Sequence, residues 1–134
     1  MKKIFAVLLI ALTCLSLTGC SLFGGGKGPG TYEECKSIVE SYFKTNNINF
    51  MIDPYHCFDN SAEQTSGHIM YLKYLISVNG IATSCELDCY SSADEAQASL
   101  DNVNERYTYV VVGTWVVSCT DSKVANDVAR AIRS

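Results

Sequence analysis

The chain of 134 residues contains 10 basic and 14 acidic residues, which gives a formal net charge of −4 at pH 7. The basic residues are not clustered, so we expect no nucleic-acid partner, because phosphate contacts need grouped Lys and Arg side chains. The length suits one small domain with a single hydrophobic core.

The first 20 residues, MKKIFAVLLIALTCLSLTGC, have the features of an export signal. Lys2 and Lys3 precede a nearly uninterrupted apolar run from Ile4 to Leu17. The run is shorter than the roughly 20 apolar residues that a membrane-spanning helix needs. Its length and basic start are typical of a signal-peptide core. We therefore predict a signal peptide over residues 1–19.

Small residues and a cysteine close this leader. Leu17, Thr18, Gly19 and Cys20 resemble the lipobox of bacterial lipoproteins. The resemblance implies cleavage between Gly19 and Cys20 and a diacylglycerol on the Cys20 thiol. Two acyl chains anchor a protein stably, at about 0.8 kcal/mol per buried methylene group. The resemblance therefore implies an extracytoplasmic protein held at the cell membrane by its lipid, and we expect no other cofactor.

The residues after the lipobox predict a tether followed by one domain. Residues 20–30 are rich in glycine, and such segments behave as flexible linkers. The folded domain is expected over residues 31–134. Without Lys2 and Lys3 the mature chain has 8 basic against 14 acidic residues, a net charge of −6. Its own charge would not attract it to anionic lipid, so the acyl chains would provide the anchoring.

The first predicted element of the domain is a helix that follows Thr31 and ends near Asn46–Asn47. Thr31 and Glu34 form a capping-box pattern, in which each side chain satisfies a free backbone N–H. Apolar residues then recur at helical spacing: Tyr32, Cys35, Ile38, Val39, Tyr42 and Phe43.

A short strand and a long loop are predicted next. The strand runs from Ile48 to Ile52, and Pro54 ends its pairing or confines it to an edge. Residues 53–68 show no regular pattern, which predicts a long loop of the kind that is either functional or mobile.

The strongest signal in the chain is a β-hairpin around Asn79-Gly80, a dipeptide that favours the positive φ angles of a two-residue turn. The predicted register pairs Val78 with Ile81, Tyr74 with Cys85, Leu72 with Leu87, and Met70 with Cys89. It gathers one apolar face: Met70, Leu72, Tyr74, Ile76, Val78, Ile81, Cys85, Leu87 and Cys89. A slip of one residue would turn this face outward, so the register is well specified.

Three further elements are predicted after the hairpin. A helix capped by Ser92 is expected to bury one stripe: Ala93, Ala96, Leu100, Val103 and Tyr107. A single strand is expected through YVVVGTWVVSC, with a bend or bulge at Gly113. A last helix is expected to begin at Asp121 or Ser122 and to bury Val124, Val128 and Ile132. The order α-β-β-β-α-β-α predicts an α+β two-layer sandwich, with helices on one face of a mostly antiparallel sheet.

The mature domain holds five disulfide candidates: Cys35, Cys57, Cys85, Cys89 and Cys119. Export would permit disulfides, and the odd number leaves at least one thiol without an intrachain partner. Cys85 and Cys89 are roughly 13 Å apart along one strand, whereas a disulfide needs Cα atoms within about 7 Å. Each would need another partner, such as Cys35, Cys57 or Cys119. The alternative is that most are small buried apolar residues.

Metal and catalytic sites receive little support from the sequence. The ligand types of His56, Cys57, His68 and the Cys85/Cys89 pair suit zinc, but their spacing does not. Cys57 and His68 could form a nucleophile–base pair across the loop, yet no known catalytic motif is present. We expect neither a metal nor an enzyme. A thiol-redox protein, a Cys/His-dependent enzyme and a metal-binding lipoprotein remain the alternatives.

Two tyrosines suggest a binding surface. Tyr71 and Tyr90 fall near each other on the predicted solvent face of the hairpin, and His56 lies in the neighbouring loop. Exposed aromatic residues beside a loop can contact a small ligand or an envelope protein. Alternatively, a helix covers this face, or the tyrosine pair only stabilises the sheet. The leading prediction is a non-catalytic binding or accessory module of the cell envelope.

Overall fold

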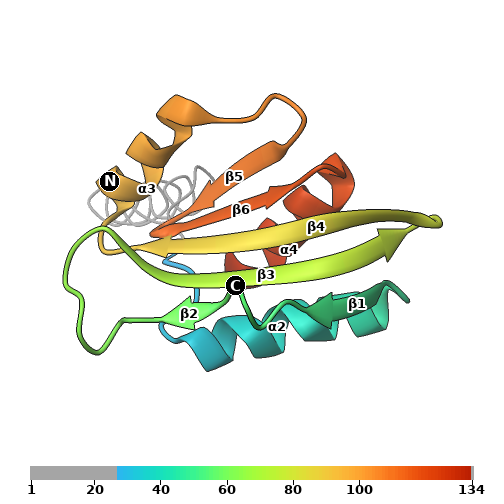
Figure 1. Cartoon of the computed structure of the whole chain (residues 1–134), viewed down its shortest axis with the longest axis horizontal. Helices are drawn as coiled ribbons and strands as arrows, with labels where there is room; N and C mark the ends of the chain where they lie inside the picture. The colour runs from blue at the N-terminus through green and yellow to red at the C-terminus, as the bar shows by residue number, and fades with distance from the viewer. Residues whose placement is uncertain (1–26, 134) are drawn as a thin grey trace, which may run out of the picture.

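The computed structural model of the chain describes residues 27–133. The predicted signal peptide, its cleavage site at Gly19–Cys20 and the lipid position Cys20 lie outside the described residues. In chain order the elements are α2 (Tyr32–Thr45), β1 (Asn49–Ile52), β2 (Phe58–Asp59), β3 (His68–Val78), β4 (Ile81–Tyr90), α3 (Ala93–Ala98), the 3₁₀ turn η1 (Ser99–Asn102), β5 (Thr108–Val112), β6 (Trp115–Cys119) and α4 (Ser122–Arg133) (Figure 1).

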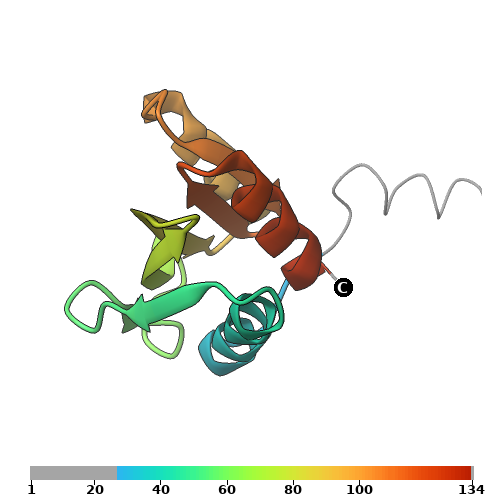
Figure 2. The same cartoon turned by 90° about the vertical axis from the view of Figure 1, so that its right-hand side faces the viewer.

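The strands form one antiparallel sheet in the order β1-β3-β4-β6-β5, and β2 pairs with β3 on the same edge as β1. The predicted α+β class is confirmed. Helices α2 and α4 pack together on one face of the sheet (Figure 2). The short α3 contacts β4 and β6 from the other face, so the expectation of helices on a single face holds for α2 and α4 only.

The central hairpin has the predicted register at every pair named from the sequence. Asn79 and Gly80 have φ angles of 52° and 79°, so both turn positions are left-handed, as a type I′ turn requires. The twist of this turn matches that of the flanking strands, and the turn therefore fixes which side chains of β3 and β4 reach the core.

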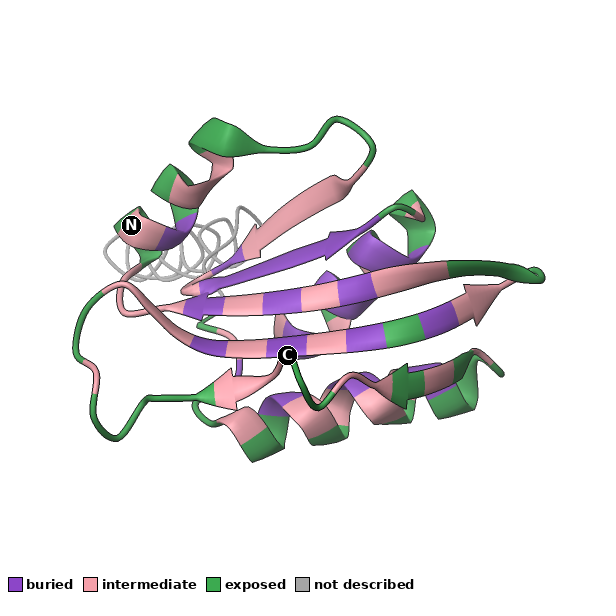
Figure 3. Ribbon diagram, in the orientation of Figure 1, coloured by how far each residue is buried: buried purple, intermediate pink, exposed green. Residues whose placement is uncertain are grey.

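Burial alternates along β3 and β4, as the period of two predicts (Figure 3). Leu72, Tyr74, Cys85 and Leu87 are fully buried beneath the helices. Ile81 was predicted to share this face but is 70% exposed. Ile81 is the first residue of β4, whereas β6 pairs only with the segment from Cys85 to Cys89, so β6 does not extend beside β4 as far as the hairpin tip.

The segment predicted as one bent strand is a second hairpin. Val112 pairs with Trp115, and Gly113 and Thr114 form the turn between β5 and β6. Gly113 has a φ of 59°, which fits the first central position of a type II′ turn. The chain therefore reverses at Gly113 instead of bending, and the sheet has one more strand than predicted.

The helix after β4 is shorter than predicted. Ser92 caps it as expected, accepting a 3.1 Å hydrogen bond from the Glu95 N–H. The α-helix ends at Ala98, and of the predicted stripe only Ala96 is fully buried. Ala93 is exposed in the first turn of α3, and Val103 is exposed because the backbone has left the helical conformation there.

The caps of the two long helices are close to the predicted ones. Thr31 Oγ1 accepts a 3.1 Å hydrogen bond from the Glu34 N–H, and Glu34 accepts from Gly30 N–H rather than from Thr31 itself. Asp121 caps α4 by accepting a 3.0 Å hydrogen bond from Val124 N–H. Each helix then turns one apolar stripe to the core, and α4 buries Val124, Ala125, Val128, Ala129 and Ile132.

The ordered packing begins before the predicted boundary at residue 31. Pro29 is buried, and its carbonyl accepts a 2.9 Å hydrogen bond from the buried Trp115 indole N–H. Gly28 has a φ of 74°, and a Cβ at this position would lie 2.7 Å from Trp115 Cδ1. The last residues of the predicted tether are therefore part of the domain.

Replacing Gly28 with alanine should destabilise the domain more than the same change at Gly80. Both glycines have left-handed φ angles, so each alanine pays about 1 kcal/mol of backbone strain. Only Gly28→Ala adds a clash, because a Cβ at Gly80 has nothing within 4 Å. We expect a total loss of roughly 2–4 kcal/mol for Gly28→Ala once overpacking is included. Urea unfolding of both variants measures the difference, and equal midpoints would contradict the packing of Gly28 on Trp115.

Candidate functional site

Four rings meet on the outer face of the sheet, where β2, β3 and β4 come together. We call this group the aromatic cluster: Phe58, His68, Tyr71 and Tyr90. The rings of His68 and Tyr90 are stacked, with centroids 5.0 Å apart and an interplanar angle of 20°. The Phe58 ring lies 5.0 Å from His68 and 6.0 Å from Tyr71. All four side chains are partly exposed, so the cluster forms a surface rather than a core.

A β-bulge places His68 in this cluster. The register pairs His68 with Tyr90 and Met70 with Cys89, so Ile69 is the extra residue. Without the bulge, His68 would point to the same face as Met70, because side chains alternate along a strand. The bulge turns the imidazole to the outer face instead, where it links Tyr71 to Tyr90.

Two carboxylates border the rings. The Asp88 Oδ1 atom lies 2.8 Å from His68 Nε2, and the Tyr71 hydroxyl donates a hydrogen bond to Glu86. Burial, followed by this bond to Glu86, raises the pKa of Tyr71, and burial raises the pKa of Tyr90. Both phenols therefore remain protonated at neutral pH. The surface offers ring faces and negative charge, which together suit a ligand with cationic or apolar groups.

His56 and Cys57, singled out from the sequence, lie in a tight turn between β1 and β2. His56 Nδ1 is 2.7 Å from Asp53 Oδ2, and the imidazole is exposed. The Cys57 thiol donates to the Asp53 carbonyl at 3.0 Å and accepts from the Lys73 N–H at 3.3 Å. The thiol thus provides a hydrogen-bond partner for the Lys73 N–H at the point where the turn interrupts strand pairing with β3. The structure gives Cys57 and His68 different partners and does not join them as a nucleophile–base pair.

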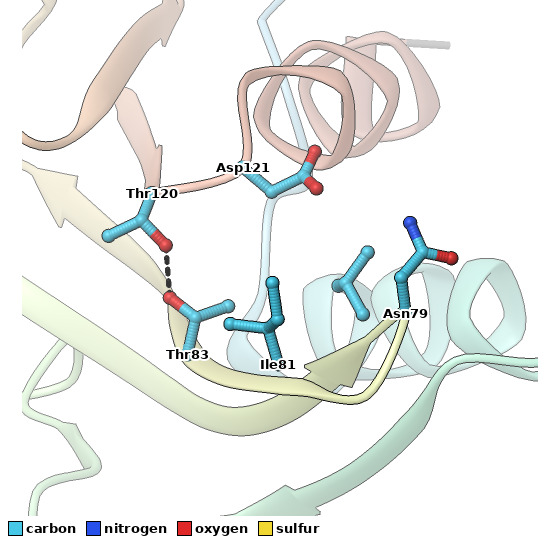
Figure 4. Close-up of a pocket in the computed structure, with 6 residues that line it drawn as sticks. Asn79, Ile81, Thr83, Thr120 and Asp121 are labelled. Atoms are coloured by element: carbon cyan, nitrogen blue, oxygen red, sulfur yellow. Dashed lines mark hydrogen bonds between the residues drawn. The ribbon is translucent and has the colours of Figure 1, made fainter.

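A separate hollow lies at the opposite end of the sheet, beside the hairpin tip (Figure 4). It has a volume of about 210 Å³ and is lined by Val78, Asn79, Ile81, Thr83, Thr120 and Asp121. Thr83 and Thr120 hydrogen-bond to each other, and Asp121 already caps α4. The polar side chains of Thr83, Thr120 and Asp121 are therefore engaged within the protein, which leaves Asn79 as the main polar side chain that the hollow offers to a small ligand.

The five cysteines within residues 27–133 are all free thiols in the structure, and the four other than Cys57 lie in the core. Cys35, Cys85, Cys89 and Cys119 are almost completely buried between the sheet and α2 and α4. Burial raises the pKa of Cys35 far above its ordinary value, and a hydrogen bond with Cys119, together with burial, does the same for Cys85. These thiols are not available to a substrate at the surface.

Two of the four residues in the aromatic cluster are predictable from the sequence. Tyr71 and Tyr90 were named, and the structure brings them together through His68. Phe58 was missed because β2 has only two residues and lies within the predicted loop. His68 was considered only for metal binding and catalysis, because the bulge that reorients it has no clear signal in the sequence.

No metal centre is formed within the part of the chain that the structure describes. No three His, Cys, Asp or Glu side chains among residues 27–133 are grouped closely enough to hold an ion. The residues considered for zinc are instead separated among the edge turn, the aromatic cluster and the core. Within the same residues, no helix combines the length and apolar character needed to cross a bilayer.

The chain was compared with known protein families, curated proteins and solved structures. No protein family, curated protein or solved structure matches the chain significantly.

Removing the imidazole of His56 should raise the pKa of Asp53. The hydrogen bond from His56 holds this pKa below its ordinary value of 3.8. A lowered pKa means that the interaction stabilises the fold above about pH 4 and that this stabilisation is lost as pH falls through the folded pKa. An NMR titration of the Asp53 carboxyl in His56→Ala should therefore show a pKa closer to 3.8. His68→Ala is the matched control, and an equal shift in both variants would contradict the assignment.

Proposed function

We propose that this chain is a lipid-anchored extracytoplasmic protein whose domain acts without catalysis, as a binding module of the cell envelope. The lipobox-like residues Leu17 to Cys20 support the anchor. The aromatic cluster supports the binding role, and it is the observation on which that part of the proposal depends. Partly exposed aromatic residues gathered at one place are typical of contact surfaces rather than of the rest of a protein exterior.

The charge around the cluster favours a partner that presents basic side chains. Glu86 and Asp88 border the rings, and the mature chain carries a net charge of −6. A Lys or Arg side chain can contact a carboxylate and lie over a ring face at the same time. We therefore propose a basic segment of an envelope protein as the partner, ahead of a small uncharged ligand.

The alternative functions draw less support from the geometry. A thiol-redox protein needs a reactive thiol at the surface, whereas four of the five described cysteines are buried. Cys57 is partly exposed, but its thiol is hydrogen-bonded to backbone groups along the edge of β3.

Cys20→Ala should abolish lipid attachment. The thiol of Cys20 is the proposed acylation site, so its loss removes both acyl chains and with them the anchoring energy. Metabolic labelling with a clickable fatty acid, followed by membrane fractionation, should show an unlabelled protein outside the membrane fraction. Cys14→Ala is the matched control, because Cys14 lies within the predicted leader and should not affect labelling. A wild-type mature N-terminus that carries no fatty acid in mass spectrometry would contradict the anchor.

Tyr90→Ala should weaken capture of the partner without unfolding the domain. Tyr90 stacks on His68 at one side of the cluster and is partly exposed, so its removal takes an accessible ring face away from the surface. Loss of an aromatic side chain that contacts the partner directly typically costs about 2 kcal/mol, which is roughly a 30-fold weaker affinity. Quantitative crosslinking in intact cells measures the effect, and circular dichroism checks the fold. Tyr55→Ala is the control, since Tyr55 is 93% exposed outside the cluster. Equal crosslinking by both variants would contradict the proposed surface.

A further inference from the structure

Two buried cysteines face each other across the centre of the sheet. Cys85 of β4 and Cys119 of β6 are direct partners in the strand register, and both are 0% exposed. The β4–β6 pairing is also the one pairing within the described sheet that joins the β3–β4 hairpin to the β5–β6 hairpin. The pair therefore lies at the junction of the two halves of the sheet.

The hydrogen-bond pattern of the sheet brings these two side chains close together. Val78 and Ile81 flank a two-residue turn and exchange hydrogen bonds, so alternate residues of β4, including Cys85, bond toward β3. The intervening residues bond toward β6, as the 2.8 Å bond from Tyr90 N–H to the Thr114 carbonyl shows. Cys85 and Cys119 are thus a non-hydrogen-bonded pair, for which Cα atoms are about 4.5 Å apart and side chains are closest.

We propose that Cys85 and Cys119 form a disulfide when the chain folds in an oxidising compartment. A Cα separation of about 4.5 Å lies within the range that a disulfide accepts. The inference rests on the proposed extracytoplasmic location for its occurrence in cells, because disulfides persist there and are rare in the cytosol. The bond would tie the two hairpins together covalently at their shared boundary.

The bond forms by thiol–disulfide exchange with a disulfide-bearing oxidant. The Cys119 thiolate attacks one sulfur of the oxidant, which breaks the oxidant's disulfide and gives a mixed disulfide and one thiolate. The Cys85 thiolate then attacks the Cys119 sulfur, which forms the Cys85–Cys119 bond and releases the second thiolate. The two protons from the cysteine thiols end on the two thiols of the oxidant. The pair loses two electrons and the oxidant gains them.

The other cysteines are placed less favourably for this bond. In the same register Cys89 lies opposite Trp115, and its sulfur is 3.4 Å from Thr114 Oγ1. Cys57 lies at the β3 edge of the sheet, bound to backbone groups. Cys35 lies on α2, where it contacts the core from the helix side.

Peptide mapping of the full chain tests the pairing. The chain, expressed with its own leader, is unfolded in urea, refolded in a buffer of reduced and oxidised glutathione, and blocked with N-ethylmaleimide. Digestion after Lys, Arg and Glu separates Cys85 from Cys89, because cleavage follows Glu86. The expected product is peptide 74–86 joined to peptide 107–123. Alkylation of both Cys85 and Cys119 in the refolded protein, or linkage of Cys85 to Cys35, would overturn the proposal.

Paired alanine variants give a second measurement. Reductant should lower the urea midpoint of the wild type and of Cys35→Ala/Cys89→Ala, and it should leave Cys85→Ala/Cys119→Ala unchanged. If reductant no longer changes the urea midpoint of Cys35→Ala/Cys89→Ala, the disulfide involves Cys35 or Cys89, and the proposed pairing is wrong.

Protein taken directly from cells separates this inference from the proposed function. Cells are lysed in N-ethylmaleimide, and the same peptides are mapped. A bond that forms on refolding but is absent from cells would leave the pairing intact and contradict the proposed location. If Cys20 carries lipid but neither the refolded protein nor the protein from cells has the bond, the proposed location stands and the proposed disulfide is wrong.

Discussion

The register of the central hairpin is the constraint on which the rest of the structure depends. The left-handed turn at Asn79-Gly80 sets Val78 opposite Ile81, and each pair farther along follows from that one. It sends one set of side chains to α2 and α4 and the other set to the outer face, where Tyr71 and Tyr90 meet His68. A slip of one residue would bury Lys73 and Glu86 and expose the core, so the sheet has no neighbouring register to adopt.

The parts of the fold that the sequence predicted are those with a clear period or a specific turn. The I′ turn, the alternation along β3 and β4, and the apolar stripe of α4 all carry such signals. The β5–β6 hairpin did not, because Trp115–Cys119 is buried at every position and therefore shows no alternation. A continuous apolar run on both sides of Gly113 looks like one strand, and only the positive φ of that glycine reveals the turn.

The aromatic cluster was partly predictable for a related reason. Tyr71 and Tyr90 follow from the regular register, but His68 reaches them through a bulge at Ile69 that breaks the alternation. The position of Phe58 is set by β2, a strand of two residues that forms by pairing with β3 and has no strand signal of its own in the sequence. Irregular positions of this kind re-aim single side chains, and they are more frequent at functional surfaces than along regular strands.

The start of the domain and the aromatic cluster lie at the same end of the sheet. Trp115, which binds the Pro29 carbonyl, pairs with Cys89, while the neighbouring Tyr90 pairs with His68. The chain from Cys20 to Gly28 can extend at most about 28 Å. Under the proposed lipid anchor, the cluster would therefore stay within reach of the bilayer, while the tip of the β3–β4 hairpin lies at the other end of the sheet (Figure 1). A partner that binds the cluster would then have to reach a site within about that distance of the membrane surface.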